Sequence, residues 1–303
     1  MPTWVAACVW LIVLGNAGHL TCMRAEPLGP RVQTAGYVLL ALQVASFLLC
    51  QTTEPGQPPA AWIAAVKEGG SNAPSFSRHP DIAGLCIPPR ARYVWRSKVV
   101  VLHFDHFCWF LQRNIGLRNR KFFILFVLYS ISLCSFALIV CLCDLLPPLV
   151  RGYSGKPLDG FAGSTFDVDT SSMPVEVTRE AIYDAHMSYE FHELEQRLGP
   201  RYVWWSYVFI ALNFAAMCFL GDLGGRAVSH ALRNRVLLSP DDDRYDVGLW
   251  KNIRAVFGDV AALWLLPLPG TASSGDGLSF PLNPHSKFDP ELEARSENGE
   301  HED

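Results

Sequence analysis

Residues 122–143 read FFILFVLYSISLCSFALIVCLC and contain no Lys, Arg, Asp or Glu. Three further runs of similar length, at residues 2–23, 32–53 and 202–221, also lack these four residue types. A helix of about twenty apolar residues is long enough to cross a hydrocarbon core of roughly 30 Å. The sequence therefore predicts an all-α polytopic membrane protein with four transmembrane helices.

The composition of the whole chain agrees with a membrane protein. Of its 303 residues, 50% are hydrophobic and only 18% are charged, which is unusual for a soluble domain. The nine cysteines lie mostly in or beside the apolar runs, so they do not outline the disulfide framework of a secreted protein. The first run is alternatively a cleaved signal peptide, but no Lys or Arg precedes it. Residues 260–267 are apolar but too short to span, and they predict a packed or surface-lying element.

The charges of the loops indicate an orientation in the membrane. Residues 54–121 contain ten Lys or Arg and four acids, whereas residues 147–201 contain five and nine. Because cytosolic loops are enriched in basic residues, we expect the first loop and both termini in the cytosol. The expected units are residues 1–53 with two transmembrane helices, 54–121 as a cytosolic, mostly irregular reactive module, 122–145 as the third helix, 146–201 as a lumenal loop, 202–222 as the fourth helix and 223–303 as a cytosolic tail. The expected location is an endomembrane (Golgi or ER) or the plasma membrane.

The tetrapeptide Asp105-His106-Phe107-Cys108 lies in the basic loop, shortly before the third apolar run. A carboxylate that orients an imidazole, and an imidazole that lowers the pKa of a thiol, form an activated sulfur nucleophile. Next to a membrane, such a thiol would meet long-chain acyl-CoA and the cysteines of membrane-associated proteins. Cys108, His106 and Asp105 are therefore the candidate catalytic residues. Alone, the tetrapeptide is equally a chance surface sequence.

The residues around this tetrapeptide resemble the cysteine-rich region of the Asp-His-His-Cys (DHHC) protein S-acyltransferases. That family has a Pro-Arg element, a Met-Asp-His-His-Cys-Pro-Trp block and a Gly-x-x-Asn-x-x-x-Phe segment that enters the third span. The matching residues here, without a gap, are Pro89, Arg90, Asp105, His106, Cys108, Gly116, Asn119 and Phe123. A second match lies in the tail, where Tyr245-Asp246-Val247-Gly248, Asn252 and Val256-Phe257-Gly258 are similar to the family's C-terminal element.

The resemblance implies a protein S-palmitoyltransferase. Such an enzyme transfers a fatty acyl group from acyl-CoA, through a thioester on Cys108, to cysteines of membrane-associated proteins. The implied partners are acyl-CoA, protein substrates with cytosolic cysteines and the lipid bilayer, with no nucleic acid. Asn119, Asn252 and Phe257 are expected to be structural.

Basic residues near the reactive segment are candidates for contacts with the phosphates of CoA. The four expected contacts are Arg90, Arg92, Lys98 and Arg118, within a wider set that also includes Arg96, Arg113, Arg120 and Lys121. Their alternative role is to hold the loop in the cytosol and to contact anionic lipid.

The chain departs from the family at the zinc ligands, which in the family are structural. The corresponding positions here hold Tyr93, Val94, Ser97, Val100, Phe107 and Asn114. None of these side chains is an ordinary thiolate or imidazole ligand, so we expect no cofactor and no bound zinc. We expect the apolar replacements to form a small hydrophobic cluster that stabilises the loop instead. A residual site made by His79, Cys86 and His103 is the alternative.

A second departure follows the fourth span, where family members carry Thr-Thr-x-Glu and a Thr orients the catalytic Asp. Here residues 224–231 read GGRAVSHA, with Ser229 as the nearest hydroxyl. Trp109 also stands where the family has the Pro after the Cys. These departures leave open a catalytically inactive membrane scaffold or adaptor. A channel or transporter is disfavoured because the spans contain almost no charged residue.

Overall fold

The computed structural model of the protein describes Gly15 and residues 29–69, 76–79, 82–153, 200–269 and 275–287. Three expectations fall largely or wholly outside these residues: the first transmembrane helix, the lumenal loop and the end of the tail. The side chains of residues 143–153 and 200–205 are likewise outside the description.

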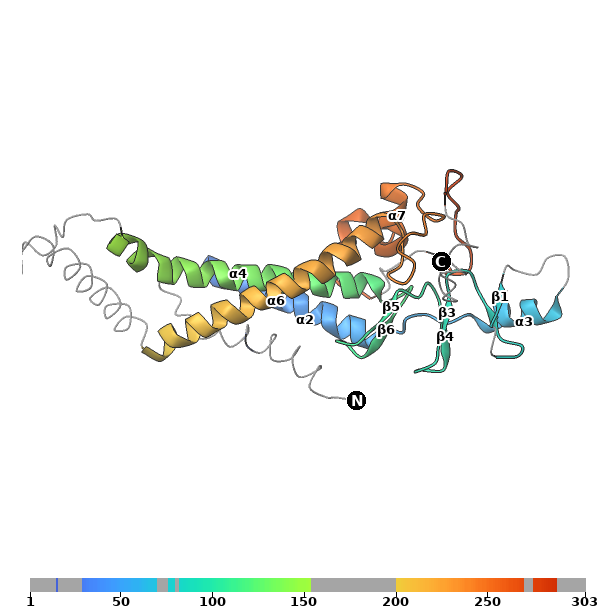
Figure 1. Cartoon of the computed structure of the whole chain (residues 1–303), viewed down its shortest axis with the longest axis horizontal. Helices are drawn as coiled ribbons and strands as arrows, with labels where there is room; N and C mark the ends of the chain where they lie inside the picture. Colours follow the sequence, from blue (N-terminus) through green and yellow to red (C-terminus); the bar gives the residue numbers. More distant parts are fainter. Residues whose placement is uncertain are drawn as a thin grey trace, which may run out of the picture.

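Three long helices form the body of the molecule: α2 (Gly29–Thr52), α4 (Arg120–Tyr153) and α6 (Pro200–Leu232) (Figure 1). Each contains a segment of 23 to 27 residues that is long and apolar enough to cross a membrane. These segments correspond to the second, third and fourth expected spans. The protein is therefore mostly helical, with three candidate membrane-spanning helices in its described part.

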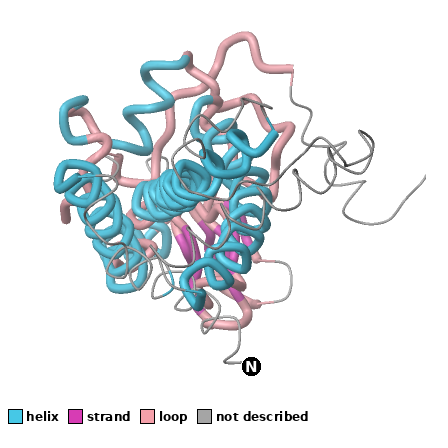
Figure 2. Tube along the Cα trace, turned by 90° about the vertical axis from the view of Figure 1, so that its left-hand side faces the viewer, coloured by secondary structure: helices cyan, strands magenta, loops and turns pink. Residues whose placement is uncertain are grey.

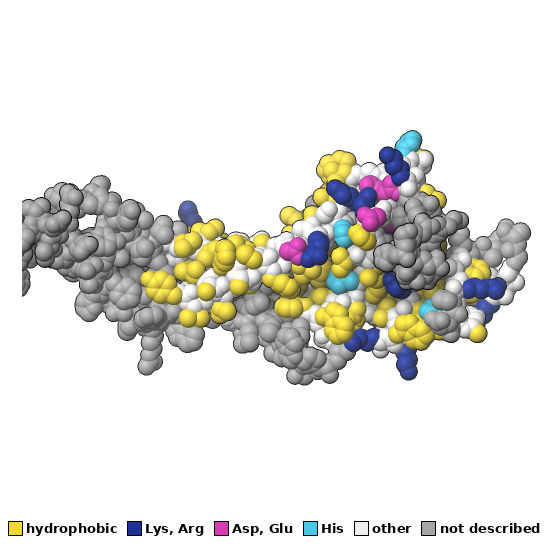
Figure 3. Space-filling model, in the orientation of Figure 1, with side chains coloured by type: hydrophobic (Ala, Val, Ile, Leu, Met, Phe, Trp, Pro, Cys, Tyr) yellow, Lys and Arg dark blue, Asp and Glu magenta, His cyan; other side chains and the backbone are white. Residues whose placement is uncertain are grey.

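Helix α4 packs against both α2 and α6, and Figure 2 shows helices gathered beside the strands. A buried hydrogen bond of 2.9 Å from Gln43 Nε2 to Ser130 Oγ joins α2 to α4. The outer faces of α2 and α6 instead expose large apolar side chains such as Val38 (52%) and Leu212 (63%). Figure 3 shows a stretch of hydrophobic side chains over the helices, while charged side chains gather toward the other end. This arrangement suits helices that face lipid.

The chain between α2 and α4 folds into a small module at one end of the helices (Figure 1). It contains the helix α3 (Ala60–Glu68) and three antiparallel strand pairs. The pairs are β1 (Ser77–Arg78) with β2 (Cys86–Ile87), β3 (Arg92–Val94) with β4 (Val99–Val101), and β5 (His106–Cys108) with β6 (Arg113–Ile115). Much of the module is irregular, as expected, but the sequence did not predict the strand pairs. Strands of two or three residues are too short to show an alternating pattern.

Close backbone contact joins the strand pairs to each other. Gly116 follows β6, and a Cβ atom there would lie 2.7 Å from Val101 Cγ1 and 2.9 Å from the Leu102 carbonyl oxygen. Only glycine fits such an approach. The Leu117 N–H also donates to the Leu102 carbonyl oxygen at 3.0 Å. The β5–β6 pair is therefore held firmly beside the β3–β4 pair.

The tail returns to the module after α6. Helix α7 (Leu249–Phe257) packs against α6 and α4, and the short 3-10 helix η3 (Ala261–Leu263) follows it. The apolar stretch expected to be packed or surface-lying thus begins with η3, and Lys121 Nζ donates to the Leu263 carbonyl oxygen at 2.9 Å. A hydrophobic core forms where helices, module and tail meet, and it includes Phe47, Cys50, Cys108, Ile115, Phe122, Phe126, Leu220 and Val256.

Candidate active site

The three candidate catalytic side chains meet at strand β5. His106 and Cys108 are two residues apart on this strand, and alternate residues of a strand share a face. Asp105 immediately precedes the strand, and its Oδ2 lies 2.8 Å from His106 Nδ1. The side chains of His106 and Cys108 are also hydrogen-bonded. The structure therefore connects carboxylate, imidazole and thiol in the order that thiol activation requires.

The surroundings of His106 favour its protonated form. Burial alone would lower the pKa of the imidazole, but its hydrogen bonds to Asp105 and Cys108, together with their charges, raise that pKa to about 9. The ring of Phe123 packs edge-on against the imidazole, with centroids 5.0 Å apart. If His106 takes the proton of the Cys108 thiol, the imidazole therefore stays protonated at neutral pH.

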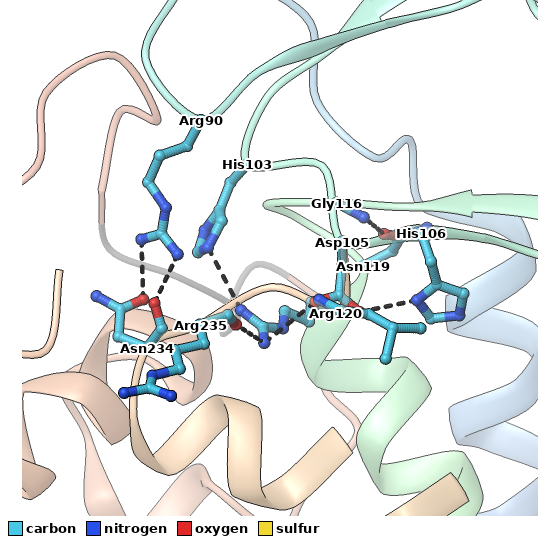
Figure 4. Close-up of polar contacts among 10 residues, drawn as sticks. Arg90, His103, Asp105, His106, Gly116, Asn119, Arg120, Asn234 and Arg235 are labelled. Carbon is cyan, nitrogen blue, oxygen red and sulfur yellow. Dashed lines mark hydrogen bonds and ion pairs between the residues drawn. The ribbon is translucent and has the colours of Figure 1, made fainter. Parts of the chain in front are cut away.

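The carboxylate of Asp105 is buried and charged. Burial would raise its pKa, but Arg120, the hydrogen bond with His106 and the Leu237 N–H hold the pKa below its ordinary value. Asp105 Oδ1 lies 3.2 Å from Arg120 Nη2 and accepts from the Leu237 N–H at 3.3 Å (Figure 4). In the described part of the chain, Ser229 is not among the partners of this carboxylate. Arg120, His106 and the Leu237 N–H therefore orient the carboxylate of Asp105, which the sequence alone had left without an orienting partner.

The thiol of Cys108 faces an apolar environment. Cys108 is only 6% exposed and belongs to the hydrophobic core at the end of the helices. Phe47 of α2 and Phe126 of α4 pack against each other in the same core, with ring centroids 5.6 Å apart. A nucleophile in this position can react with a group whose long apolar portion extends among the helices.

Arg90, one of the four expected phosphate contacts, points inward. Its guanidinium donates to Asn234 Oδ1 at 3.0 Å and to the Asn234 carbonyl oxygen at 2.6 Å. It also lies over the rings of Tyr245 and Phe280, at 4.3 Å and 5.0 Å from their centroids. Burial, and then the charge of Arg120, lower the pKa of Arg90 to about 9. The guanidinium of Arg90 thus binds the tail, and a contact between Arg90 and CoA phosphate stays an untested prediction.

The other basic residues divide into surface and buried groups. Arg92, Lys98 and Arg118 are exposed on the module, and their contact with CoA remains a prediction. Arg120 and Lys121, from the wider set, are 3% and 0% exposed, and their side chains bond to other parts of the chain. Proximity in sequence to the reactive segment therefore did not separate surface cations from internal ones.

Two buried asparagines hold the backbone at the places where the sequence predicted structural residues. Asn119 Oδ1 accepts from the Gly116 N–H, and its Nδ2 donates to the Asn114 carbonyl oxygen, both at 2.9 Å. This closes the turn that leads into α4. Asn252 Oδ1 accepts from the Val247 N–H at 3.1 Å, and its Nδ2 donates to the Leu232 carbonyl oxygen at 2.8 Å.

Asn252 thereby attaches α7 to the end of α6. Its Nδ2 also donates to Asp246 Oδ1 at 2.7 Å, which fixes the loop before the helix. Phe257, at the end of α7, packs against the hydrophobic core that contains Cys108. The tail is therefore docked beneath the reactive segment.

Sequence reasoning missed Asn234 and considered His103 only as a possible zinc ligand. His103 is 2% exposed, and its Nε2 lies 3.3 Å from Arg120 Nη1. Arg90, His103 and Asn234 all have positive φ angles, of 58°, 45° and 50°, which residues other than glycine seldom adopt. A shared strained backbone around one polar cluster is typical of functional sites. No pattern in the sequence signals these angles.

Comparisons with known proteins place the chain in a family. Residues 82–235, half of the chain, match the family model described as DHHC palmitoyltransferase. The chain belongs to the DHHC palmitoyltransferase family.

Three curated relatives share this similarity at low identity. The chain is 28% identical over 227 residues to palmitoyltransferase ZDHHC2 of Danio rerio, covering 71% of this chain and 49% of that protein. It is 26% identical over 201 residues to palmitoyltransferase PFA3 of Yarrowia lipolytica, covering 65% and 47%. It is 25% identical over 231 residues to palmitoyltransferase ZDHHC15 of Homo sapiens, covering 76% and 57%. The chain spans about half the length of the curated relatives it matches.

The zinc-ligand positions of the DHHC pattern hold side chains that do not fit zinc. Val94 is buried with Val101 and Phe104, and Phe107 packs against them. Asn114 Nδ2 donates to Ser97 Oγ at 2.9 Å. These side chains pack on or bond to one another and offer neither thiolate nor imidazole, so no chemical step is assigned to a metal.

The side chains of His79, Cys86 and His103, the alternative zinc ligands, are not grouped together in the described part of the chain. Among the described residues, no three His, Cys, Asp or Glu side chains are grouped so that they could hold a metal ion. The ring of His79 instead packs edge-on against Tyr93 and Trp95, at centroid distances of 5.4 Å and 5.5 Å. His103 lies in the polar cluster with Arg120.

Proposed function

We propose that this DHHC family member is a protein S-acyltransferase, which transfers a fatty acyl group such as palmitoyl from acyl-CoA to cysteines of membrane-associated proteins. The observation that carries the proposal is the connected triad at the apolar end of the helices. His106 bonds to Asp105 at 2.8 Å and to Cys108, and the thiol lies in the hydrophobic core. The family and the palmitoyltransferase names of the relatives agree with this chemistry.

The first half-reaction loads the enzyme. His106 takes the proton of the Cys108 thiol, and Sγ attacks the thioester carbonyl carbon of acyl-CoA. A new bond forms between Sγ and the acyl carbon while the bond to the CoA sulfur breaks. The CoA thiolate leaves with the proton from His106. Asp105 keeps the imidazole oriented and balances its charge.

The second half-reaction transfers the acyl group. A substrate cysteine gives its proton to His106 and attacks the acyl carbon held on Cys108. The bond to Cys108 breaks, and His106 returns the proton to the departing thiolate. Neither half-reaction consumes an oxidant, a reductant or a metal, and the sequence predicts ping-pong kinetics.

The two ends of acyl-CoA would lie in different surroundings. The acyl chain would extend from Cys108 among α2, α4 and α6, where the core is apolar. The phosphates would lie on the module surface, where Arg92, Lys98 and Arg118 are exposed. This division accounts for a reactive thiol at the junction of module and helices.

The proposed orientation follows from the same arrangement. The protein would have four transmembrane helices, with the module and both termini in the cytosol of an endomembrane or the plasma membrane. Support comes from the excess of Lys and Arg in residues 54–121 and from the gathering of charged side chains at the module end of the helices. Acyl-CoA and protein cysteines would then both approach from the cytosol.

The test is incorporation of an alkyne palmitate analogue, supplied as its CoA thioester, into the purified chain. Wild type is compared with Cys108→Ala and, as a matched control in the same module, Cys86→Ala. We expect a hydroxylamine-sensitive label on wild type and on Cys86→Ala and none on Cys108→Ala. Equal label on all three would place lipid on other cysteines. No label on any of them would favour a membrane scaffold or adaptor.

A further inference from the structure

The two oxygens of the buried Asp105 carboxylate bind different partners. Its Oδ2 bonds to His106 Nδ1 at 2.8 Å, while its Oδ1 meets Arg120 Nη2 at 3.2 Å and the Leu237 N–H at 3.3 Å. We propose that Arg120 is a positioning residue for acyl transfer, which keeps Asp105 ionised and aligned with His106. It would do the work of the threonine that the DHHC resemblance leads one to expect after the fourth span. This inference rests on the proposed acyltransferase function.

Arg120 joins three parts of the chain that are distant in sequence. It is the first residue of α4, yet its side chain is 3% exposed. Besides binding Asp105, Nη2 donates to the Arg235 carbonyl oxygen, and Nη1 lies 3.3 Å from His103 Nε2. Figure 4 shows the guanidinium between Asp105, His103 and Arg235. A planar guanidinium with several fixed donors suits this bridging position, and a lysine ammonium does not.

His103 is the third partner of the Arg120 guanidinium, after Asp105 and Arg235. Its imidazole is buried, and burial, with the charges of Arg90 and Arg120, holds its pKa well below the ordinary range. His103 is therefore neutral and accepts a hydrogen bond from Arg120 Nη1. Since a neutral acceptor adds no positive charge, the guanidinium remains available to balance Asp105.

The pairing matters to Asp105 because a buried carboxylate without a cation tends to take up a proton. Arg120 is the largest of the influences that oppose this effect of burial on the pKa of Asp105. The other charged or titratable groups near Asp105 are His106 on β5, His230 on α6 and Arg90. Of these, only His106 bonds to the carboxylate, and it does so from the opposite oxygen. Loss of Arg120 would therefore leave Asp105 prone to protonation and free to turn.

The experiment measures the rate of thioester formation on the purified full chain from mildly acidic to mildly alkaline pH. It compares wild type, Arg120→Gln, Arg120→Lys and Arg254→Gln. Arg254 lies exposed on α7, so its substitution removes the same charge without touching the cluster. We expect Arg120→Gln to slow thioester formation about 10- to 100-fold and Arg254→Gln to leave it unchanged.

The pH profile separates positioning from a loss of folded protein. Asp105 works as a carboxylate, and because its pKa is held below the ordinary value it stays charged over the whole measured pH range in wild type. In Arg120→Gln that pKa rises, so this variant should show an extra loss of activity toward the acidic end of the range that wild type does not show. Arg120→Lys keeps the charge but not the bridging geometry, so its rate should fall without the extra loss of activity at acidic pH. A merely structural role would lower the rate of Arg120→Gln equally at every pH, and that result would overturn the inference.

The outcomes also distinguish this inference from the proposed function. If wild type forms no thioester, acyltransferase function fails. If wild type forms it and Arg120→Gln matches wild type in rate and profile, only the role of Arg120 fails. Where Arg120→Gln does not fold, Arg120→Lys decides alone, with its rate compared to wild type at equal amounts of folded protein: a slower rate per folded molecule supports positioning, and a wild-type rate overturns it.

Discussion

The β3–β4 pair and the β5–β6 pair lie side by side in one module but are stabilised in different ways. Around β3–β4, Val94 and the neighbouring Phe107, both at zinc-ligand positions of the family pattern, form one apolar cluster with Val101 and Phe104. At β5–β6, a buried carboxylate, two imidazoles and a guanidinium are bonded to one another. Ligands can be replaced wherever apolar packing does the same work, whereas the chemistry of a thiol nucleophile requires particular polar groups.

The tail helps to hold the module together. Arg90 bonds to Asn234 and lies over the rings of Tyr245 and Phe280. The rings of Tyr245 and Phe280 also pack against each other, with centroids 5.6 Å apart. Structural zinc concentrates a large folding free energy in one site. In this module, cation–π contacts, hydrogen bonds and apolar packing supply stabilisation that is spread over many residues.

The largest expected effect comes from removing the imidazole of the β5–β6 region. His106→Ala should slow thioester formation by about 10²–10⁴-fold, because the proton of the thiol then has no positioned acceptor. His79→Ala is the matched control, since His79 packs against Tyr93 in the other region. The measurement is hydroxylamine-sensitive labelling over time. If both variants formed the thioester equally slowly, the two regions would not differ in function.

The next effect concerns the charge of Asp105. The pKa of His106 is raised to about 9, so the imidazolium persists at neutral pH and loses its proton as the pH rises through that value. Asp105→Asn removes the carboxylate and should lower this pKa. Alkylation of Cys108 by iodoacetamide should then slow about tenfold near neutral pH and recover toward wild type above about pH 9, where ordinary thiols ionise unaided. A profile identical to wild type would show that the carboxylate does not act through His106.

Much of the site could be predicted because its chemistry is local in sequence. Asp105, His106 and Cys108 lie within four residues, and the structure connects them as the thiol mechanism requires. The second, third and fourth expected spans could be predicted equally well, since long uncharged runs predict membrane helices directly. Family membership followed from two motifs in the same order, and residues 82–235 confirm it.

The parts of the site that the sequence did not predict depend on contacts between residues that are far apart in the chain. Arg120 meets the Arg235 carbonyl oxygen and Arg90 meets Asn234, pairs separated by 115 and 144 residues. From the sequence, a basic residue at the edge of a membrane helix is interpreted as a surface anchor or a phosphate contact. Only the fold shows that Arg90 and Arg120 point inward. A single sequence contains no pattern that pairs them with their partners.

A smaller effect tests whether apolar packing stabilises the β3–β4 region. Val101 is fully buried between Val94 and Phe104, so Val101→Ala should lower the free energy of unfolding by about 1–3 kcal/mol. Val260→Ala, at a position 57% exposed, is the control and should change little. Denaturant unfolding of the purified chain in detergent gives both values. Equal small effects would mean that the cluster contributes no more than a surface residue.

The smallest expected effect is that of a strong zinc chelator on the melting temperature and on thioester formation. The side chains at the zinc-ligand positions include the bonded pair Asn114 and Ser97 and the buried Val94, none of which holds a metal through thiolate or imidazole. We therefore expect both quantities to stay unchanged, while a zinc-dependent protein treated in parallel unfolds. A melting temperature that falls with the chelator would show that a metal stabilises the module. Apolar packing would then not be what stabilises the β3–β4 region.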